Sequence, residues 1–452
     1  MKRAFWLAGA AAVVVLAGLG LFALNRTPEA TTSSPAALAE FRAAMDAEMK
    51  LYKAESTAHL ERAIELDPGF VIAKVFLSDA LHQSDPERSG RLLGEASAAD
   101  RERLTPREQL FLERALALRE ERAQDAQTML DSYLERYPDD PWALNVKAMQ
   151  AWRTGDHEAA DRYYRRLIEL DPNWVIAYNM LGYLTMNQGK FTEAEEFFTT
   201  YRFVAPDQAN PHDSLGELFI VLGRYPEAEE TLQRALAIKP DFWISYEHLV
   251  LLRNLQRDME GAREVIARAA THEGPAEGFQ KRLECAVQSE ELLFERSWQQ
   301  VLDLVTSGCP EGKGNAVRID IVVHQAACQL GDWARAEAIE ARLEPKDQGK
   351  GALDDVDEGY MAAVCKHLRG TRLALQGKLA EAETSFAEAD AGLGYTDAGT
   401  GIFKLVNRLC LVEVLFAEKR DAEAHKLLTK VRAVNPELAR EFETMGMHYL
   451  GL

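Results

Sequence analysis

Residues 138–240 decide the fold, because one pattern passes through them three times. They read PDDPWALNVKAMQAWRTGDHEAADRYYRRLIELD (138–171), PNWVIAYNMLGYLTMNQGKFTEAEEFFTTYRFVA (172–205) and PDQANPHDSLGELFIVLGRYPEAEETLQRALAIK (206–239). Residues that recur at a period of 34 are Pro138, Pro172, Pro206 and Pro240; Gly155, Gly189 and Gly223; Ala126, Ala160, Ala194, Ala228 and Ala262. Three residue types in one phase indicate a repeat, and this period is typical of helical hairpins stacked as a solenoid.

The rest of the chain also has the periodicity of helices. From about Ala36 onward, apolar residues recur at steps of three and four, and no segment alternates as a strand would. The phrase Leu-Ile-Glu-Leu-Asp-Pro at 167–172 ends an amphipathic helix, because proline cannot continue it. The sequence therefore predicts an all-α protein.

The repeat resembles the tetratricopeptide repeat. Leu181-Gly182 and Leu215-Gly216 match the small-residue pair of the first helix, with Ala148 in the glycine's place one unit earlier. Ala194 with Phe198, and Ala160 with Tyr164, match the small and large residues of the second helix. The resemblance implies a right-handed superhelical solenoid of antiparallel helix hairpins.

The regularity of the repeats varies along the chain. We predict an N-terminal array at 36–276, clearest at 107–276, followed by degenerate repeats at 277–452. Gly331 with Ala336 and Gly377 with Ala382 repeat the turn spacing there, which places units near 282–315, 317–350, 363–396 and 405–438. Inserts are expected around 349–357 and 392–401, and the glycines of the second are interpreted as a flexible loop.

The N-terminus carries an uncharged run, Ala4 to Leu24, behind Lys2 and Arg3. As a helix this run spans the roughly 30 Å of a bilayer core. We predict a cytoplasmic stub (1–3), a transmembrane anchor (4–24) and a linker (25–35); a cleaved signal peptide is the alternative. Positive charges ahead of the span place the repeats outside the cytoplasm, in the periplasm of a bacterium, as a single-pass inner-membrane protein.

The charge balance excludes one class of partner. Lys plus Arg number 52 against 72 Asp plus Glu, a formal net charge of −20. Nucleic-acid binding needs a basic face, so we expect no nucleic-acid partner.

No motif for catalysis, a cofactor or a metal stands out. The chain lacks His-Glu-x-x-His and Gly-x-Ser-x-Gly, and the glycines at 308–314 do not fit a phosphate loop. His212, His248 and His324 each lie on a predicted helix without a paired ligand, and are interpreted as core or surface residues. We therefore expect no enzyme, no cofactor and no metal.

The five cysteines all lie in the C-terminal half, and an odd number leaves at least one unpaired. Cys285 opens the first helix of a predicted hairpin and Cys309 closes the second, so antiparallel packing brings them together. They are a candidate disulfide if the compartment is oxidising. Otherwise the cysteines are small buried residues.

In tetratricopeptide arrays the first helices line a concave groove that holds a peptide. The positions that match this groove here are Trp142, Asn145, Met149, Trp152, Ile176, Asn179, Tyr183, Met186, Asn187, Asn210, Asp213, Glu217, Glu247 and Leu251. Four of them, Asn145, Asn179, Asp213 and Glu247, recur every 34 residues as a polar ladder that can bond an extended backbone. The acidic members favour a basic or neutral segment. Packing between hairpins is the alternative role, especially for the tryptophans.

The favoured function is a membrane-anchored scaffold that binds protein or peptide partners for complex assembly or a chaperone-like role. The alternative is a ligand-binding sensor that acts on a membrane partner. Neither the partner nor the pathway follows from the sequence.

Overall fold

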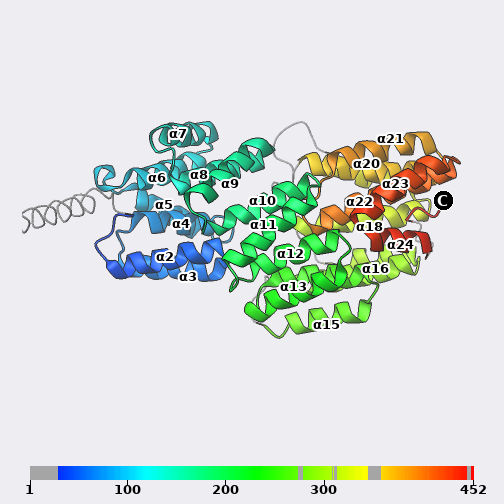
Figure 1. The fold of residues 1–452 in the computed structure, drawn as a ribbon, viewed down its shortest axis with the longest axis horizontal. Helices are drawn as coiled ribbons and strands as arrows, with labels where there is room; N and C mark the ends of the chain where they lie inside the picture. The colour runs from blue at the N-terminus through cyan, green and yellow to red at the C-terminus, as the bar shows by residue number, and fades with distance from the viewer. Residues whose placement is uncertain (1–28, 273–277, 308, 310–312, 345–357, 445–448) are drawn as a thin grey trace, which may run out of the picture. The chain divides into compact units, whose positions relative to one another are not determined.

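The computed structural model describes residues 29–272, 278–307, 309, 313–344, 358–444 and 449–452. Within these ranges the chain is helical and contains no strand (Figure 1). It divides into two compact units, one ending at Tyr163 and the other spanning Tyr164–Leu452. The all-α repeat fold is confirmed. The two units meet between Tyr163 and Tyr164, inside the array of regular repeats. The boundary predicted near residue 276 separates regular from degenerate repeats, and it stays a prediction.

The first unit is a series of hairpins joined by short turns. Its helices are α2 (Pro35–Met49), α3 (Lys53–Leu66), α4 (Val71–Ala80), α5 (Pro86–Ser97), the 3-10 turn η1 (Arg101–Arg103), α6 (Pro106–Arg119), α7 (Ala123–Arg136), α8 (Pro141–Arg153) and the start of α9 (His157–Leu170).

The second unit takes up the end of α9 and continues the series to the last described residues. Its helices are α10 (Val175–Asn187), α11 (Phe191–Val204), α12 (Asn210–Val221), α13 (Tyr225–Ile238), α14 (Trp243–Leu255), α15 (Met259–Ala269), α16 (Phe279–Phe294), α17 (Trp298–Ser307), α18 (Lys313–Gln329), α19 (Trp333–Leu343), α20 (Glu358–Leu375), α21 (Leu379–Gly392), α22 (Ala398–Ala417), α23 (Asp421–Val434) and α24 (Pro436–Thr444).

The hairpin turns explain the periodic glycines. Gly155, Gly189 and Gly223 have φ of 74°, 72° and 69°, a left-handed conformation that glycine adopts without strain. Glu121 and Arg257 hold the equivalent positions one period before and one period after, with φ of 59° and 57°. The turn geometry therefore extends beyond the glycines that revealed it.

Small residues let the two helices of a hairpin approach. A Cβ at Gly182 would overlap the ring of Phe198, and one at Gly216 would overlap Leu232. Ala194, on the facing helix, is fully buried. The residues matched to the repeat from sequence thus lie at the helix contacts, where added volume would be destabilising.

Helix α12 is enclosed on all sides. All its residues are buried, including His212, Asp213 and Glu217. Helix α13 is its hairpin partner, α10, α11 and α14 pack beside it, and α22 of a distant repeat packs against it as well (Figure 1). A solenoid normally leaves one face of such a helix open, so α22 closes this one.

The described part of the predicted linker is attached to the first unit. Ala30 is buried in a core cluster with Phe41 and Phe70. The Thr31 amide and hydroxyl donate to Glu108, at 2.7 and 2.5 Å. The predicted span 4–24 lies outside the described residues. Across the described ranges, no helix combines the length and the apolar character that crossing a membrane requires.

The second unit contains a disulfide between Cys285 and Cys309, whose Cα atoms are 5.6 Å apart. It links the first half of α16 to Cys309, which follows α17. Cys328, Cys365 and Cys410 are free and buried.

Candidate functional site

Helices α10 and α12 bring predicted groove residues from two repeats into contact. Ser214 Oγ donates to Asn179 Oδ1 at 2.9 Å, and Tyr183 OH donates to Glu217 Oε2 at 2.5 Å. Asn187 lies at the C-terminal end of the same side of α10. We call the surface formed by Asn179, Tyr183, Asn187, Asp213 and Glu217 the inner face. Within it, Tyr183 and Glu217 bond to each other, and Asn179 bonds to Ser214.

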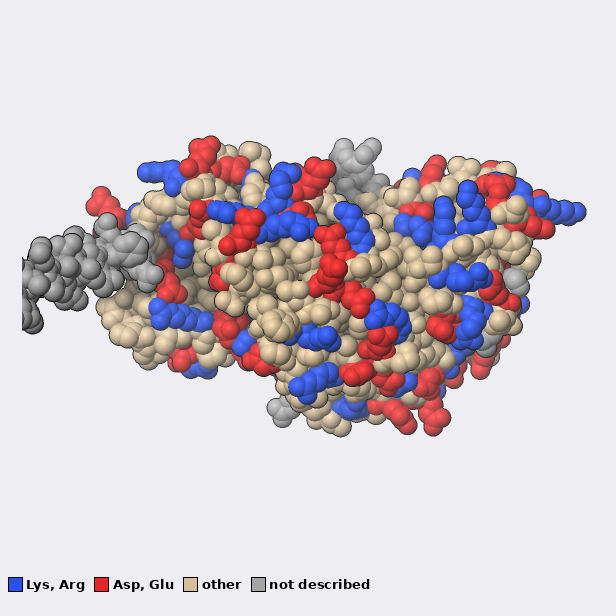
Figure 2. All heavy atoms as spheres, viewed as in Figure 1, with Lys and Arg blue, Asp and Glu red and all other residues tan. Residues whose placement is uncertain are grey.

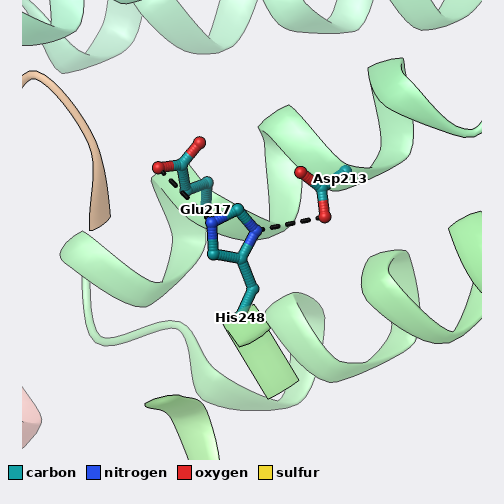
Figure 3. Close-up of side chains that lie close together, drawn as sticks. All are labelled: Asp213, Glu217 and His248. Carbon is teal, nitrogen blue, oxygen red and sulfur yellow. Dashed lines mark hydrogen bonds and ion pairs between the residues drawn. The ribbon is translucent and has the colours of Figure 1, made fainter. Parts of the chain in front are cut away.

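His248, on α14, reaches into the inner face (Figure 3). Its Nδ1 lies 3.1 Å from Asp213 Oδ1, and its Nε2 lies 3.6 Å from Glu217 Oε1. Burial by itself lowers the pKa of His248, but the two carboxylates outweigh it and raise the pKa to about 10. The ring is therefore a buried imidazolium between two acids. His248 was interpreted as a core or surface residue, and it is buried; the sequence did not show that its two carboxylate partners come from another repeat.

Burial shapes the pKa of the acids on the same face. It raises the pKa of Glu217, although the charge of His248 opposes this. Burial also raises the pKa of Glu247, the neighbour of His248 on α14. Without the imidazolium, the carboxylates of Asp213 and Glu217 would face one another in a medium that solvates charge poorly.

Asp213, Glu217 and His248 are also a donor set that suits a divalent cation. However, the two ring nitrogens of His248 face different carboxylates, so the imidazolium itself lies between them. Ser245 Oγ donates to Asp213 at 2.6 Å, and Tyr183 donates to Glu217. Asp213 and Glu217 thus receive hydrogen bonds and a counter-charge from the protein itself, and this arrangement stabilises their buried charges.

A segment from far along the chain lies on the inner face. The Tyr395 amide donates to Asn187 Oδ1 at 3.1 Å, and the Ala398 amide donates to Glu217 Oε1 at 2.7 Å. The Tyr395 ring meets Phe191 edge to face, with centroids 5.0 Å apart. We call Leu393–Ala398 the docked segment. It was interpreted as part of a flexible loop, and that was wrong: it is held by backbone hydrogen bonds.

Other contacts fix the C-terminal end of α12. Asn435 is fully buried, and its Nδ2 donates to the carbonyls of Ile220 and Val221, at 3.3 and 3.1 Å. Gly401 lies so close that a Cβ would approach Val221 Cγ2 to 2.9 Å. The C-terminal repeats therefore contact the C-terminal half of α12, from Glu217 to Val221.

The remaining predicted groove residues have different surroundings. Asn210 is buried and donates to Tyr201 OH at 3.1 Å, and Met186 is fully buried, so neither offers a surface to a partner in this conformation. Ile176, Glu247 and Leu251 are half-buried. Their partner-binding role stays a prediction.

In the first unit, α8 carries four predicted groove residues. Trp142 packs edge to face on Phe76, with centroids 6.0 Å apart, so packing is at least part of its role. Asn145 and Trp152 are half-buried, whereas Met149 is 41% exposed. Met149 is thus the most accessible of the four.

Comparison with known proteins identifies the repeats. Residues 115–173, 145–211 and 214–277 match the family model described as Tetratricopeptide repeat. These residues are tetratricopeptide repeats. The predicted resemblance is confirmed for this part of the chain. No curated protein matches the sequence.

Several solved structures are similar at low sequence identity. PilW, a widely conserved type IV pilus biogenesis factor, is 15% identical, with 43% of this chain and 90% of PilW covered and a TM-score of 0.36. A tetratricopeptide repeat protein from Parabacteroides merdae is 17% identical, covering 64% and 97%, with a TM-score of 0.34. Pseudomonas aeruginosa pilF is 14% identical, covering 52% and 91%, with a TM-score of 0.27.

Replacing His248 should destabilise the protein in a pH-dependent way. His248→Gln should lower the free energy of unfolding at pH 7 by about 3–5 kcal/mol, because two buried acids lose their counter-charge. The wild type should lose stability as the pH rises from about 6.5 towards about 10, since the folded protein keeps a proton that the unfolded chain has released. Thermal unfolding from pH 6 to 10 measures both effects.

The matched control is His59→Gln, which removes a partly exposed contact with Glu40. It should cost no more than about 1 kcal/mol. Equal losses for both variants, or an unchanged pH dependence in His248→Gln, would show that the imidazolium does not stabilise the inner face.

Proposed function

We propose that the protein is a scaffold that binds segments of other proteins on the first helices of its repeats. The observation that carries this proposal is a pair of hydrogen bonds that the backbone amides of Tyr395 and Ala398 donate to Asn187 and Glu217. Side chains of two successive repeats accept hydrogen bonds from a main chain here. Such bonds contribute affinity with little demand on side-chain sequence, which suits recognition of polypeptide segments.

The charge of the chain favours basic or neutral segments as partners. The formal net charge is −20, and acidic and basic side chains are interspersed on the face shown in Figure 2. Glu247 is half-buried and has a raised pKa because burial disfavours its charge. A basic group from a partner would stabilise the charged form of such a carboxylate.

We also propose that the repeats lie outside the cytoplasm and that residues 4–24 anchor them to the inner membrane. The support is the uncharged run behind Lys2 and Arg3. The Cys285–Cys309 disulfide adds to it, because disulfides persist in oxidising compartments and are rare in the cytosol. An anchored scaffold would assemble complexes, or hold client proteins, close to the membrane.

Site-specific crosslinking in cells tests the scaffold. A photoreactive amino acid at Met149, exposed on the first helix of its hairpin, should give discrete crosslinked proteins. The same probe at Phe203, which is 83% exposed on the second helix of its hairpin, should give none. The two positions match in being exposed and apolar. Equal crosslinking at both, or no crosslinked protein at Met149, would contradict the proposal.

Counting thiols in membranes tests the location. Washed membranes, denatured with a maleimide of high mass, should yield chain with three labelled thiols without reductant and five with it. Cys285→Ser should yield four either way, because it frees Cys309. Five labelled thiols without reductant would place the chain in a reducing compartment, and recovery in the soluble fraction would refute the anchor.

A further inference from the structure

The docked segment has the form of a bound ligand. Leu393 is extended, with φ −81° and ψ 140°, and so is Asp397, with φ −156° and ψ 175°. Leu393, Tyr395 and Ala398 are buried, whereas Thr396 and Asp397 face solvent. A non-helical stretch that buries Leu393 and Tyr395 and donates the amides of Tyr395 and Ala398 to a helical face resembles a peptide in a groove.

The conformation of the docked segment is stabilised by hydrogen bonds with residues of α21 and α22. Lys404 Nζ donates to the carbonyls of Asp390 and Leu393, at 2.5 Å each, and Arg408 Nη1 donates to Tyr395 OH at 2.9 Å. Asp397 caps α22 by accepting from the Thr400 amide at 2.8 Å. None of these bonds involves the inner face, so they do not depend on the contact with it.

The inner face is also supported independently of the docked segment. Tyr183, Ser245 and His248 hold Glu217 and Asp213, and Ser214 holds Asn179. The contacts of Gly401 and Asn435 fix the C-terminal end of α12. The exchangeable contact is therefore local: two amide bonds and one aromatic pair.

We propose that the inner face is a partner-binding site and that the docked segment is its resident competitor. The partner fits if it carries an aromatic residue on a non-helical stretch, followed three residues later by the first amide of a helix. Asn187 and Glu217 would accept its two amides, and Phe191 would receive its ring. This inference rests on the proposed scaffold function and adds the site, the partner's chemistry and a built-in threshold for binding.

Because the docked segment is covalently tethered to the protein, a partner must exceed a threshold of affinity or concentration to displace it. A segment tethered by a short connection acts at an effective concentration on the order of millimolar. A free segment with the same contacts cannot compete at micromolar concentration while the resident is in place. A partner must therefore make additional contacts, or the resident must be weakened.

A peptide-binding experiment with two matched variants tests the competitor. The probe is a fluorescent peptide of residues 390–402, DAGLGYTDAGTGI, and the readout is fluorescence anisotropy with the full chain. Gly394→Ala, a change within the docked segment, weakens the binding of that segment to the inner face, because a Cβ there would overlap Asn187 Oδ1. Asn187→Ala weakens the same contact from the side of the inner face and also removes the acceptor.

Gly394→Ala should bind the peptide at least about tenfold more tightly than the wild type, because the resident's tethered advantage is lost. Asn187→Ala should not show this gain, and a probe in which Tyr395 is replaced by Ala should bind neither variant. Tyr395→Ala in the protein is the second variant if Gly394→Ala does not reach wild-type helicity by circular dichroism.

Three results would overturn the inference. The first is that the wild type binds the peptide as tightly as Gly394→Ala does. The second is that Gly394→Ala and Asn187→Ala bind it equally. The third is that neither Gly394→Ala nor Tyr395→Ala binds it. The scaffold proposal fails separately, through the crosslinks at Met149. Crosslinks without peptide binding would leave a scaffold whose inner face is only structural.

Discussion

A helix with no solvent-exposed side must satisfy every polar group that it carries, and α12 is that helix in this protein. Asp213 and Glu217 lie one turn apart on it, and both are buried. Two carboxylates cannot stay charged together in the interior without a counter-charge. His248 supplies it from the next repeat, and Ser245, Tyr183 and the Ala398 amide supply hydrogen bonds. The packing of the surrounding repeats depends on this arrangement.

The same constraint links two parts of the chain that are distant in sequence. Glu217 accepts from both Tyr183 and Ala398, which come from opposite directions along the chain. The inner face is thus part of the repeat array and also a binding surface for the docked segment. A repeat protein that covers its own inner face in this way must uncover it to bind a partner there.

The sequence was sufficient for the features that repeat. The turn conformation of Gly155, Gly189 and Gly223, and the close contact at Gly182, follow from local sterics that recur in each hairpin. The ladder spacing also placed Asn179 and Asp213 on equivalent positions. Periodic residues predict only the structure that all repeats share, so the prediction was correct where the repeats are alike.

The features missed are those that occur once. His248 is one position away from the ladder residue Glu247, and its role depends on acids from another hairpin. The docked segment lies 208 positions from Asn187 and 181 from Glu217, and no repeat rule relates them. Its glycines suggested flexibility, yet Gly394 is small because Asn187 occupies the space beside it. Contacts between unlike units need the folded structure.

The most direct test is residue-resolved amide hydrogen exchange in the unmodified protein and in Asn187→Ala. We expect slow exchange for the Tyr395 and Ala398 amides, because each donates to a side chain of the inner face. In Asn187→Ala, protection should fall at Tyr395, whereas the Thr400 amide, bonded to Asp397, should keep its rate. Unprotected exchange at both Tyr395 and Ala398 in the unmodified protein would contradict the claim that this chain covers its own inner face.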